Sequence, residues 1–109
     1  AKAIVETKKD LYFSIISLWE IAIKVNIGEL KIHRPISALP IELHYVHIQI
    51  LPIATIDIET YSSLPLPNTP IKHRDPFDRI LIAQAMNNSL SVVSRDIAFD
   101  AYKVQRIWG

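Results

Sequence analysis

The segment "PFDRILIAQAMN", residues 76 to 87, does most to constrain how this chain can fold. Asp75 followed by Pro76 is typical of an N-cap and a first helical residue, so we predict a helix that runs to about Asn88. After Asp78 this helix is apolar on every side for two turns. A helix of that kind is buried rather than lying on a surface. The rest of the chain must therefore supply a layer that covers it.

Short β-type runs alternate with helical segments along most of the sequence. We predict strands at 11–16, 48–53, 90–94 and 103–108. We predict helices at 1–9, at 17–27 closed by Gly28 in the left-handed conformation, at 35–46, at 55–63 capped by Thr55, and a helical turn at 95–102. This alternation indicates an α/β fold with a mainly parallel sheet and helices on both faces.

Length and composition narrow the class of protein. The 109 residues are enough for one domain, residues 1–109, with a core of its own. Twelve basic side chains against eleven acidic ones exclude a polycation that binds nucleic acid by its net charge alone. The chain has no cysteine, which excludes disulfides and thiolate metal sites. No apolar run approaches the roughly 18 residues of a membrane span, so we expect a cytoplasmic protein that contacts no membrane.

Three acidic residues stand where a site of this architecture is expected. Glu20 and Asp96 each follow a predicted strand, and Asp78 begins the buried helix. Each has a simpler explanation as part of a helix cap: Glu20 in a capping box with Ser17, Asp96 as an N-cap, and Asp78 after the cap at Asp75. Against this, Glu20 and Asp78 share their helix faces with apolar side chains, where a solvated acid does not normally point.

Carboxylates that converge in one crevice repel each other unless a cation holds them together. With no cysteine, hard oxygen ligands indicate Mg²⁺ or Mn²⁺. His44 and His47 form one pair at helical spacing, but a zinc site needs further ligands. We therefore expect the histidines to lie on the surface.

Three motifs resemble a PIN domain, specifically the VapC-like toxins of bacterial toxin–antitoxin pairs: "SIISLWEIAIKVNIGEL", "HRDPFDRILIAQA" and "SVVSRDIAFDAYKVQRIW". The resemblance implies a three-layer α/β/α sandwich and a Mg²⁺- or Mn²⁺-dependent endoribonuclease. It assigns metal binding and catalysis to Glu20, Asp78 and Asp96, with Ser94 as a further ligand. Candidates for contacting RNA phosphates are Lys24, Lys72, Arg74, Arg79 and Arg95, and Asp75 and Asp100 are weaker candidates for the acidic site.

The sequence departs from this family at its start. The family's opening strand, which is central in the sheet and ends in an Asp, has no counterpart here, and "AKAIVETKK" resembles the end of the following helix. On this interpretation the domain is truncated and the middle of the sheet exposes strand edges, which another chain, a swapped segment or a rearrangement must cover. We therefore expect an oligomer with impaired or no nuclease activity, because three carboxylates bind divalent cations more weakly than four. The resemblance also implies an RNA substrate and an antitoxin partner. We expect Trp19 and Trp108 in the core.

Two other classes of protein remain open. A degenerate PIN domain would bind RNA or an antitoxin without cleaving, as the missing first Asp favours. A signalling receiver domain is also a parallel α/β fold with clustered acids, but it requires an Asp at the end of a middle strand. Here "IQILPI" is followed by Ala54 and Thr55.

Overall fold

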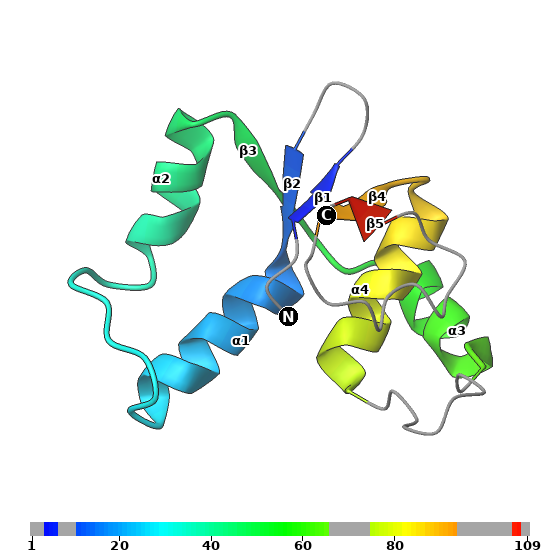
Figure 1. The fold of residues 1–109 in the computed structure, drawn as a ribbon, viewed down its shortest axis with the longest axis horizontal. Coiled ribbons are helices and arrows are strands. Elements are labelled where there is room, and N and C mark those ends of the chain that lie inside the picture. Colours follow the sequence, from blue (N-terminus) through cyan, green and yellow to red (C-terminus); the bar gives the residue numbers. More distant parts are fainter. Residues whose placement is uncertain (1–3, 7–10, 66–74, 94–105, 108–109) are drawn as a thin grey trace.

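A computed structural model of the chain describes residues 4–6, 11–65, 75–93 and 106–107. Figure 1 shows strands alternating with helices, which confirms the α/β class. The predicted helical turn at 95–102 lies outside the described residues. In chain order the elements are β1 (Ile4–Glu6), β2 (Leu11–Ser14), α1 (Ile15–Asn26), α2 (Ala38–Tyr45), β3 (Ile48–Leu51), α3 (Thr55–Ser63), α4 (Pro76–Asn87), β4 (Ser91–Val93) and β5 (Arg106–Ile107).

The five strands form one sheet in the order β3-β2-β1-β4-β5. β2 pairs with β3 and β4 with β5 in parallel, whereas β1 is antiparallel to both of its neighbours. The prediction of a mainly parallel sheet therefore holds only for the outer pairs.

The predicted N-terminal helix is wrong for residues 4–6, which form the central strand β1. Ile4 and Val5 are β-branched and suit a pleated strand, and pairing with β2 on one side and β4 on the other outweighs a weak helical preference. The expectation of exposed strand edges in the middle of the sheet is also wrong, because β1 occupies that position.

The N-cap of helix α1 lies three residues earlier than predicted. Its N-cap is Ser14, whose Oγ accepts a hydrogen bond from the Ile16 amide at 3.1 Å. Ser17 is therefore inside the helix, and the capping box proposed for Ser17 and Glu20 is wrong. At the other end the Glu29 amide donates to the Lys24 carbonyl and Gly28 has φ +82°, which confirms the left-handed C-terminal cap.

The starts of α3 and α4 show two ways to cap a helix. Thr55 is the first residue of α3 and not its cap. The N-cap position is Ala54, whose amide donates to the buried Asp57 carboxylate at 2.8 Å. At α4 the prediction is confirmed: Asp75 is the N-cap, and its Oδ1 accepts from the Phe77 amide at 2.9 Å.

The core centres on α4, as its apolar sequence predicts. One cluster consists of Leu81, Ile82, Ala85, Leu90 and Val92. A second cluster joins Ile16 of α1 to Ile80 and Ala83 of α4. Figure 1 shows α1 and α2 on one side of the sheet and α3 and α4 on the other. Among the described residues no helix is both long enough and apolar enough to cross a bilayer.

Candidate metal and nucleic-acid site

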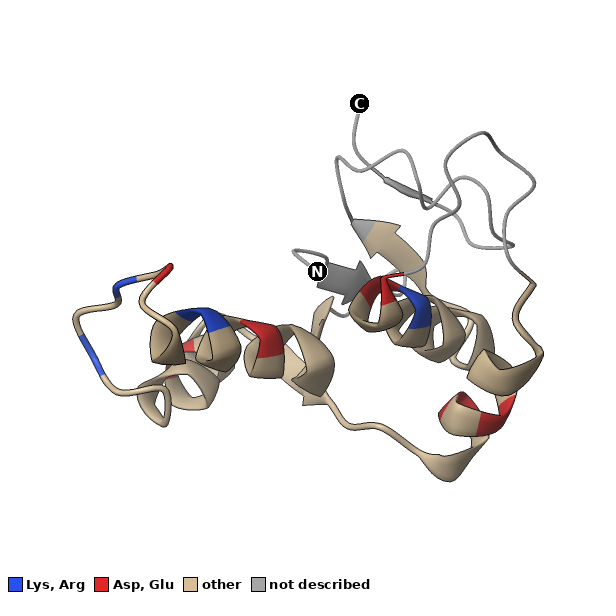
Figure 2. Ribbon diagram, turned by 90° about the horizontal axis from the view of Figure 1, so that it is seen from below, with Lys and Arg blue, Asp and Glu red and all other residues tan. Residues whose placement is uncertain are grey.

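Of the three acids predicted to form the site, the structure describes Glu20 on α1 and Asp78 on α4. Glu20 lies in the second turn of α1, half-buried, with its Oε1 atom inaccessible to solvent. Asp78 is the third residue of α4 and is 8% exposed. Neither carboxylate is a solvated surface group, as the apolar faces around them predict. Figure 2 shows an acidic segment in the middle of α1 and another in the first turn of α4.

An aromatic contact brings these two helices together beside the acids. The rings of Trp19 and Phe77 meet edge to face, with centroids 5.1 Å apart and planes at 81°. Trp19 and Phe77 immediately precede Glu20 and Asp78 in the chain, so the contact joins the two helices that carry these acids. The expectation that Trp19 lies in the core is wrong, since it is 56% exposed. Trp108 lies outside the described residues.

Gln84 links α4 to α1 from inside the core. The sequence analysis did not predict this role. It is fully buried on α4, and its Oε1 accepts a hydrogen bond from Ser14 Oγ at the start of α1. Its Nε2 lies 3.1 Å from the Pro52 carbonyl oxygen and 3.4 Å from that of Leu51. One side chain thus ties α4 to the ends of β2 and β3. The available signal was a lone amide in the apolar run "ILIAQAM".

Arg79 has a structural position in this fold. Its guanidinium is buried and donates to the carbonyl oxygens of Leu64, at 2.8 Å, and Pro65, at 3.3 Å. It also lies 5.5 Å from the centre of the Tyr61 ring. These contacts hold the C-terminal end of α3 against α4. Contact between Arg79 and an RNA phosphate stays a prediction.

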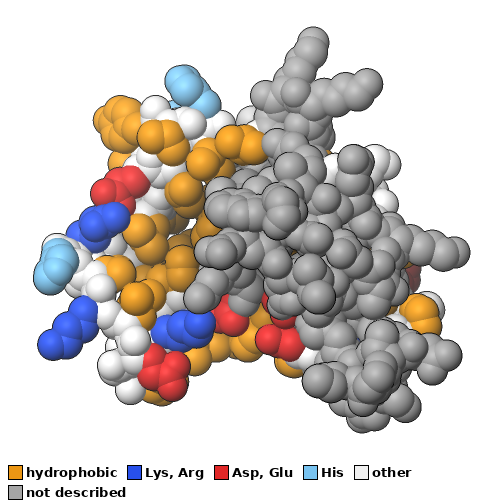
Figure 3. Space-filling view, viewed as in Figure 1, with side chains coloured by type: hydrophobic (Ala, Val, Ile, Leu, Met, Phe, Trp, Pro, Cys, Tyr) orange, Lys and Arg blue, Asp and Glu red, His pale blue; other side chains and the backbone are white. Residues whose placement is uncertain are grey.

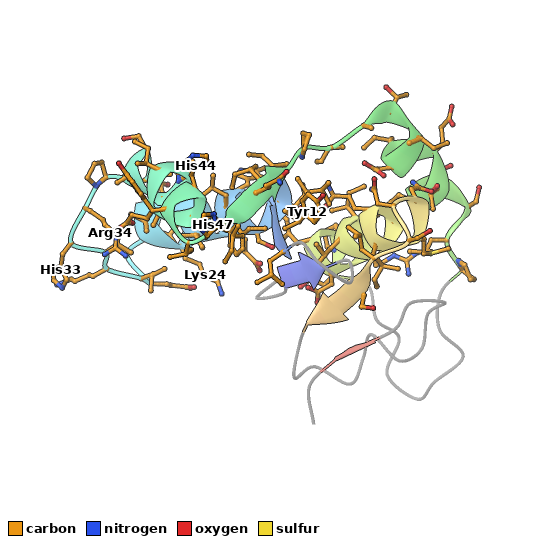
Figure 4. All side chains as sticks on the ribbon, turned by 90° about the horizontal axis from the view of Figure 1, so that it is seen from above. Tyr12, Lys24, His33, Arg34, His44 and His47 are labelled. Carbon is orange, nitrogen blue, oxygen red and sulfur yellow. The ribbon has the colours of Figure 1, made fainter. Side chains whose placement is uncertain are left out.

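Lys24 lies one turn after Glu20 and points outward from α1 (Figure 4). His33 and Arg34, which are also labelled there, lie on the loop after α1 at the end of the molecule remote from α4. Arg34 is paired with Glu42 at 2.6 Å. Lys24 is the one basic residue of α1, the helix that carries Glu20.

The described donors fit a hard divalent cation. Both acids offer carboxylate oxygens, and Ser17, one turn before Glu20, has a fully buried Oγ with no hydrogen-bond partner. A buried hydroxyl of this kind calls for a ligand or water. No group of three acids, histidines or cysteines with metal-binding geometry occurs among the described residues. Predictions for Ser94, Asp96, Lys72, Arg74, Arg95 and Asp100 fall outside the described residues.

The histidine pair forms no site in the described part of the chain. His44 and His47 are exposed at the end of α2, and Figure 4 shows them on the side of the molecule away from α4. This agrees with the expectation of surface histidines.

An α/β sheet whose helices α1 and α4 each carry a carboxylate shielded from solvent is typical of domains that act on phosphodiesters with divalent cations. The family model for the PIN domain matches residues 1–105. The chain therefore belongs to the PIN-domain family, whose members are generally nucleases and typically use divalent metals. No curated protein and no solved structure gives a significant match.

Proposed function

We propose that this chain is a divalent-metal-dependent endoribonuclease that hydrolyses RNA phosphodiesters and resembles the toxin of a VapBC-type toxin–antitoxin pair. The observation that supports the proposal is the Trp19–Phe77 contact, which joins α1 and α4, the two helices that carry Glu20 and Asp78, in a chain of the PIN-domain family. The proposed substrate and the absence of cysteine favour a cytoplasmic site of action.

The acids have the role of binding Mg²⁺ or Mn²⁺. Glu20 and Asp78 supply two carboxylates, and we assign Asp96 and Ser94 as the remaining ligands. A cation held by these residues would supply an activated water and would neutralise charge that develops on the phosphate. Burial of Asp78 strengthens its electrostatic interaction with a cation, because the local dielectric constant is lower than that of water. Lys24, Arg74, Arg79 and Arg95 are proposed phosphate contacts.

Cleavage of a labelled single-stranded RNA in Mn²⁺ or Mg²⁺, with and without EDTA, tests this function. We expect cleavage that EDTA abolishes and that Asp78→Asn lowers at least roughly a hundredfold, since loss of a metal ligand removes transition-state stabilisation. Asp75→Asn is the matched control on the same helix, because asparagine caps a helix as well as aspartate does. RNA binding without cleavage at saturating Mn²⁺ would support the non-cleaving alternative instead.

We also propose that the chain associates with a second copy and with an antitoxin. Exposed apolar side chains on and next to α2 support this: Ile41, Tyr45 and Val46 are 60%, 78% and 61% exposed. Figure 3 shows hydrophobic side chains spread over the side of the molecule that α1 and α2 occupy. Molar mass by light scattering tests self-association. A mass of 12.4 kDa at all concentrations would contradict it.

A further inference from the structure

The indole of Trp19 is exposed where α1 contacts α4. The proposed nuclease mechanism gives this side chain no role. Exposure of 56% is high for a tryptophan, which usually buries most of its large apolar surface. Its neighbour in the chain, Glu20, is the more buried of the two. The same order occurs on α4, where half-buried Phe77 precedes Asp78 at 8% exposure. On both helices the aromatic side chain is thus more exposed than the acid that follows it.

The contact with Phe77 holds the indole while leaving it accessible. Rings at 81° with centroids 5.1 Å apart meet edge to face, so this contact covers at most one face of the indole. Phe77 is itself anchored, because it packs against the cluster of Ile16, Ile80 and Ala83. A side chain restrained in this way loses less conformational entropy when a ligand stacks on it.

We propose that Trp19, supported by Phe77, is a stacking platform for one unpaired nucleobase of a single-stranded RNA next to the bond to be cleaved. Every base has a flat π-face that stacks on an exposed aromatic ring, so such a platform accepts single-stranded nucleic acid with little sequence preference. Lys24, four residues after Glu20 on the same face of α1, adds a positive charge for a phosphate beside the acid. The inference rests on the proposed function, because the ligand is the same RNA.

Intrinsic fluorescence of the intact chain tests the platform without any need for cleavage. The chain has two tryptophans, Trp19 and Trp108, so Trp108→Phe isolates the signal of Trp19. A 12-nucleotide oligoadenylate is titrated into this protein in EDTA, beside an abasic oligonucleotide of the same length and charge. We expect the oligoadenylate to quench Trp19 and to bind more tightly than the abasic chain. Equal binding and no quenching would overturn the platform.

Substitutions test whether the binding of oligoadenylate depends on the Trp19 side chain. Trp19→Ala is expected to weaken binding of the oligoadenylate by roughly 5- to 150-fold, as for one stacked base, and Trp19→Phe to retain most of the affinity. Tyr45→Ala is the matched control, because Tyr45 is an even more exposed aromatic residue on α2. A loss of affinity in Tyr45→Ala equal to that in Trp19→Ala would overturn the assignment.

The outcomes separate this inference from the proposed function. Metal-dependent cleavage by Trp19→Ala with unchanged affinity for RNA would overturn the platform and leave the nuclease intact. Quenching of Trp19 by the oligoadenylate in a chain that never cleaves would support the platform and contradict the nuclease. A change of molar mass in Trp19→Ala, without a change in RNA binding, would show that the indole contacts another protein chain instead.

Discussion

Helices α4 and α2 of this domain differ sharply in how they are held. Eight of the twelve residues of α4 are buried, whereas none of the eight residues of α2 is. Gln84, Arg79 and Asp57 make hydrogen bonds that link α4 to its neighbours. Helix α2 packs mainly along β3 and exposes large apolar side chains. The comparison indicates that α3 and α4 form the well-packed part of the molecule, called the framework below. Helix α2 instead lies on the surface.

The largest effect on stability is expected at Gln84, the centre of the framework. Gln84→Leu keeps the volume but leaves the Ser14 hydroxyl and the carbonyl groups of Leu51 and Pro52 without their partner. Stranding these buried groups should lower the free energy of unfolding by about 3 kcal/mol in a urea titration. Gln49→Leu, at an exposed position on β3, is the control. Equal losses in the two variants would mean that Gln84 is not the tie described above.

A smaller loss is expected at Asp57. Its carboxylate is 1% exposed and accepts from the Ala54 amide and, at 2.9 Å, from Asn87 Nδ2, so it joins the start of α3 to the end of α4. Asp57→Ala removes both bonds and should cost about 2 kcal/mol. Glu59→Ala, two residues later and exposed, should cost less than about 0.5 kcal/mol. Similar urea midpoints for the two variants would contradict the account.

The smallest effect on stability is expected on α2. Tyr45→Ser removes a side chain that is 78% exposed, so the free energy of unfolding should change by less than about 0.5 kcal/mol. The same variant should reduce any self-association, because it removes apolar surface from the proposed contact region. A loss above about 1 kcal/mol in dilute protein would show that α2 belongs to the core after all.

The sequence predicted the buried framework better than the sheet. The apolar run of α4, its cap at Asp75 and the left-handed Gly28 follow from local chemistry, and the structure has all three. The strand at Ile4–Glu6 does not follow from local chemistry, because its conformation depends on pairing with β2 and with β4, which is distant in the sequence.

The candidate site was predictable in part. The apolar faces around Glu20 and Asp78 correctly indicated that both acids are shielded from solvent. The start of α1 was misplaced because Ser14 and Ser17 both resemble N-caps, and only the hydrogen bond from the Ile16 amide distinguishes them. The role of Gln84 depends on groups 32 to 70 residues away, so no local pattern shows it.

The central claim is that Glu20 and Asp78 bind one cation together. The most direct test is to measure Mn²⁺ affinity by isothermal titration calorimetry for the unsubstituted chain, for Glu20→Gln, for Asp78→Asn and for the double variant. If the two acids bind one cation together, each single variant should lose at least roughly tenfold in affinity. The double variant should then lose less than the product of the two, because the shared ion is already released. Unchanged Mn²⁺ affinity in both single variants, in protein shown to be folded, would contradict the account.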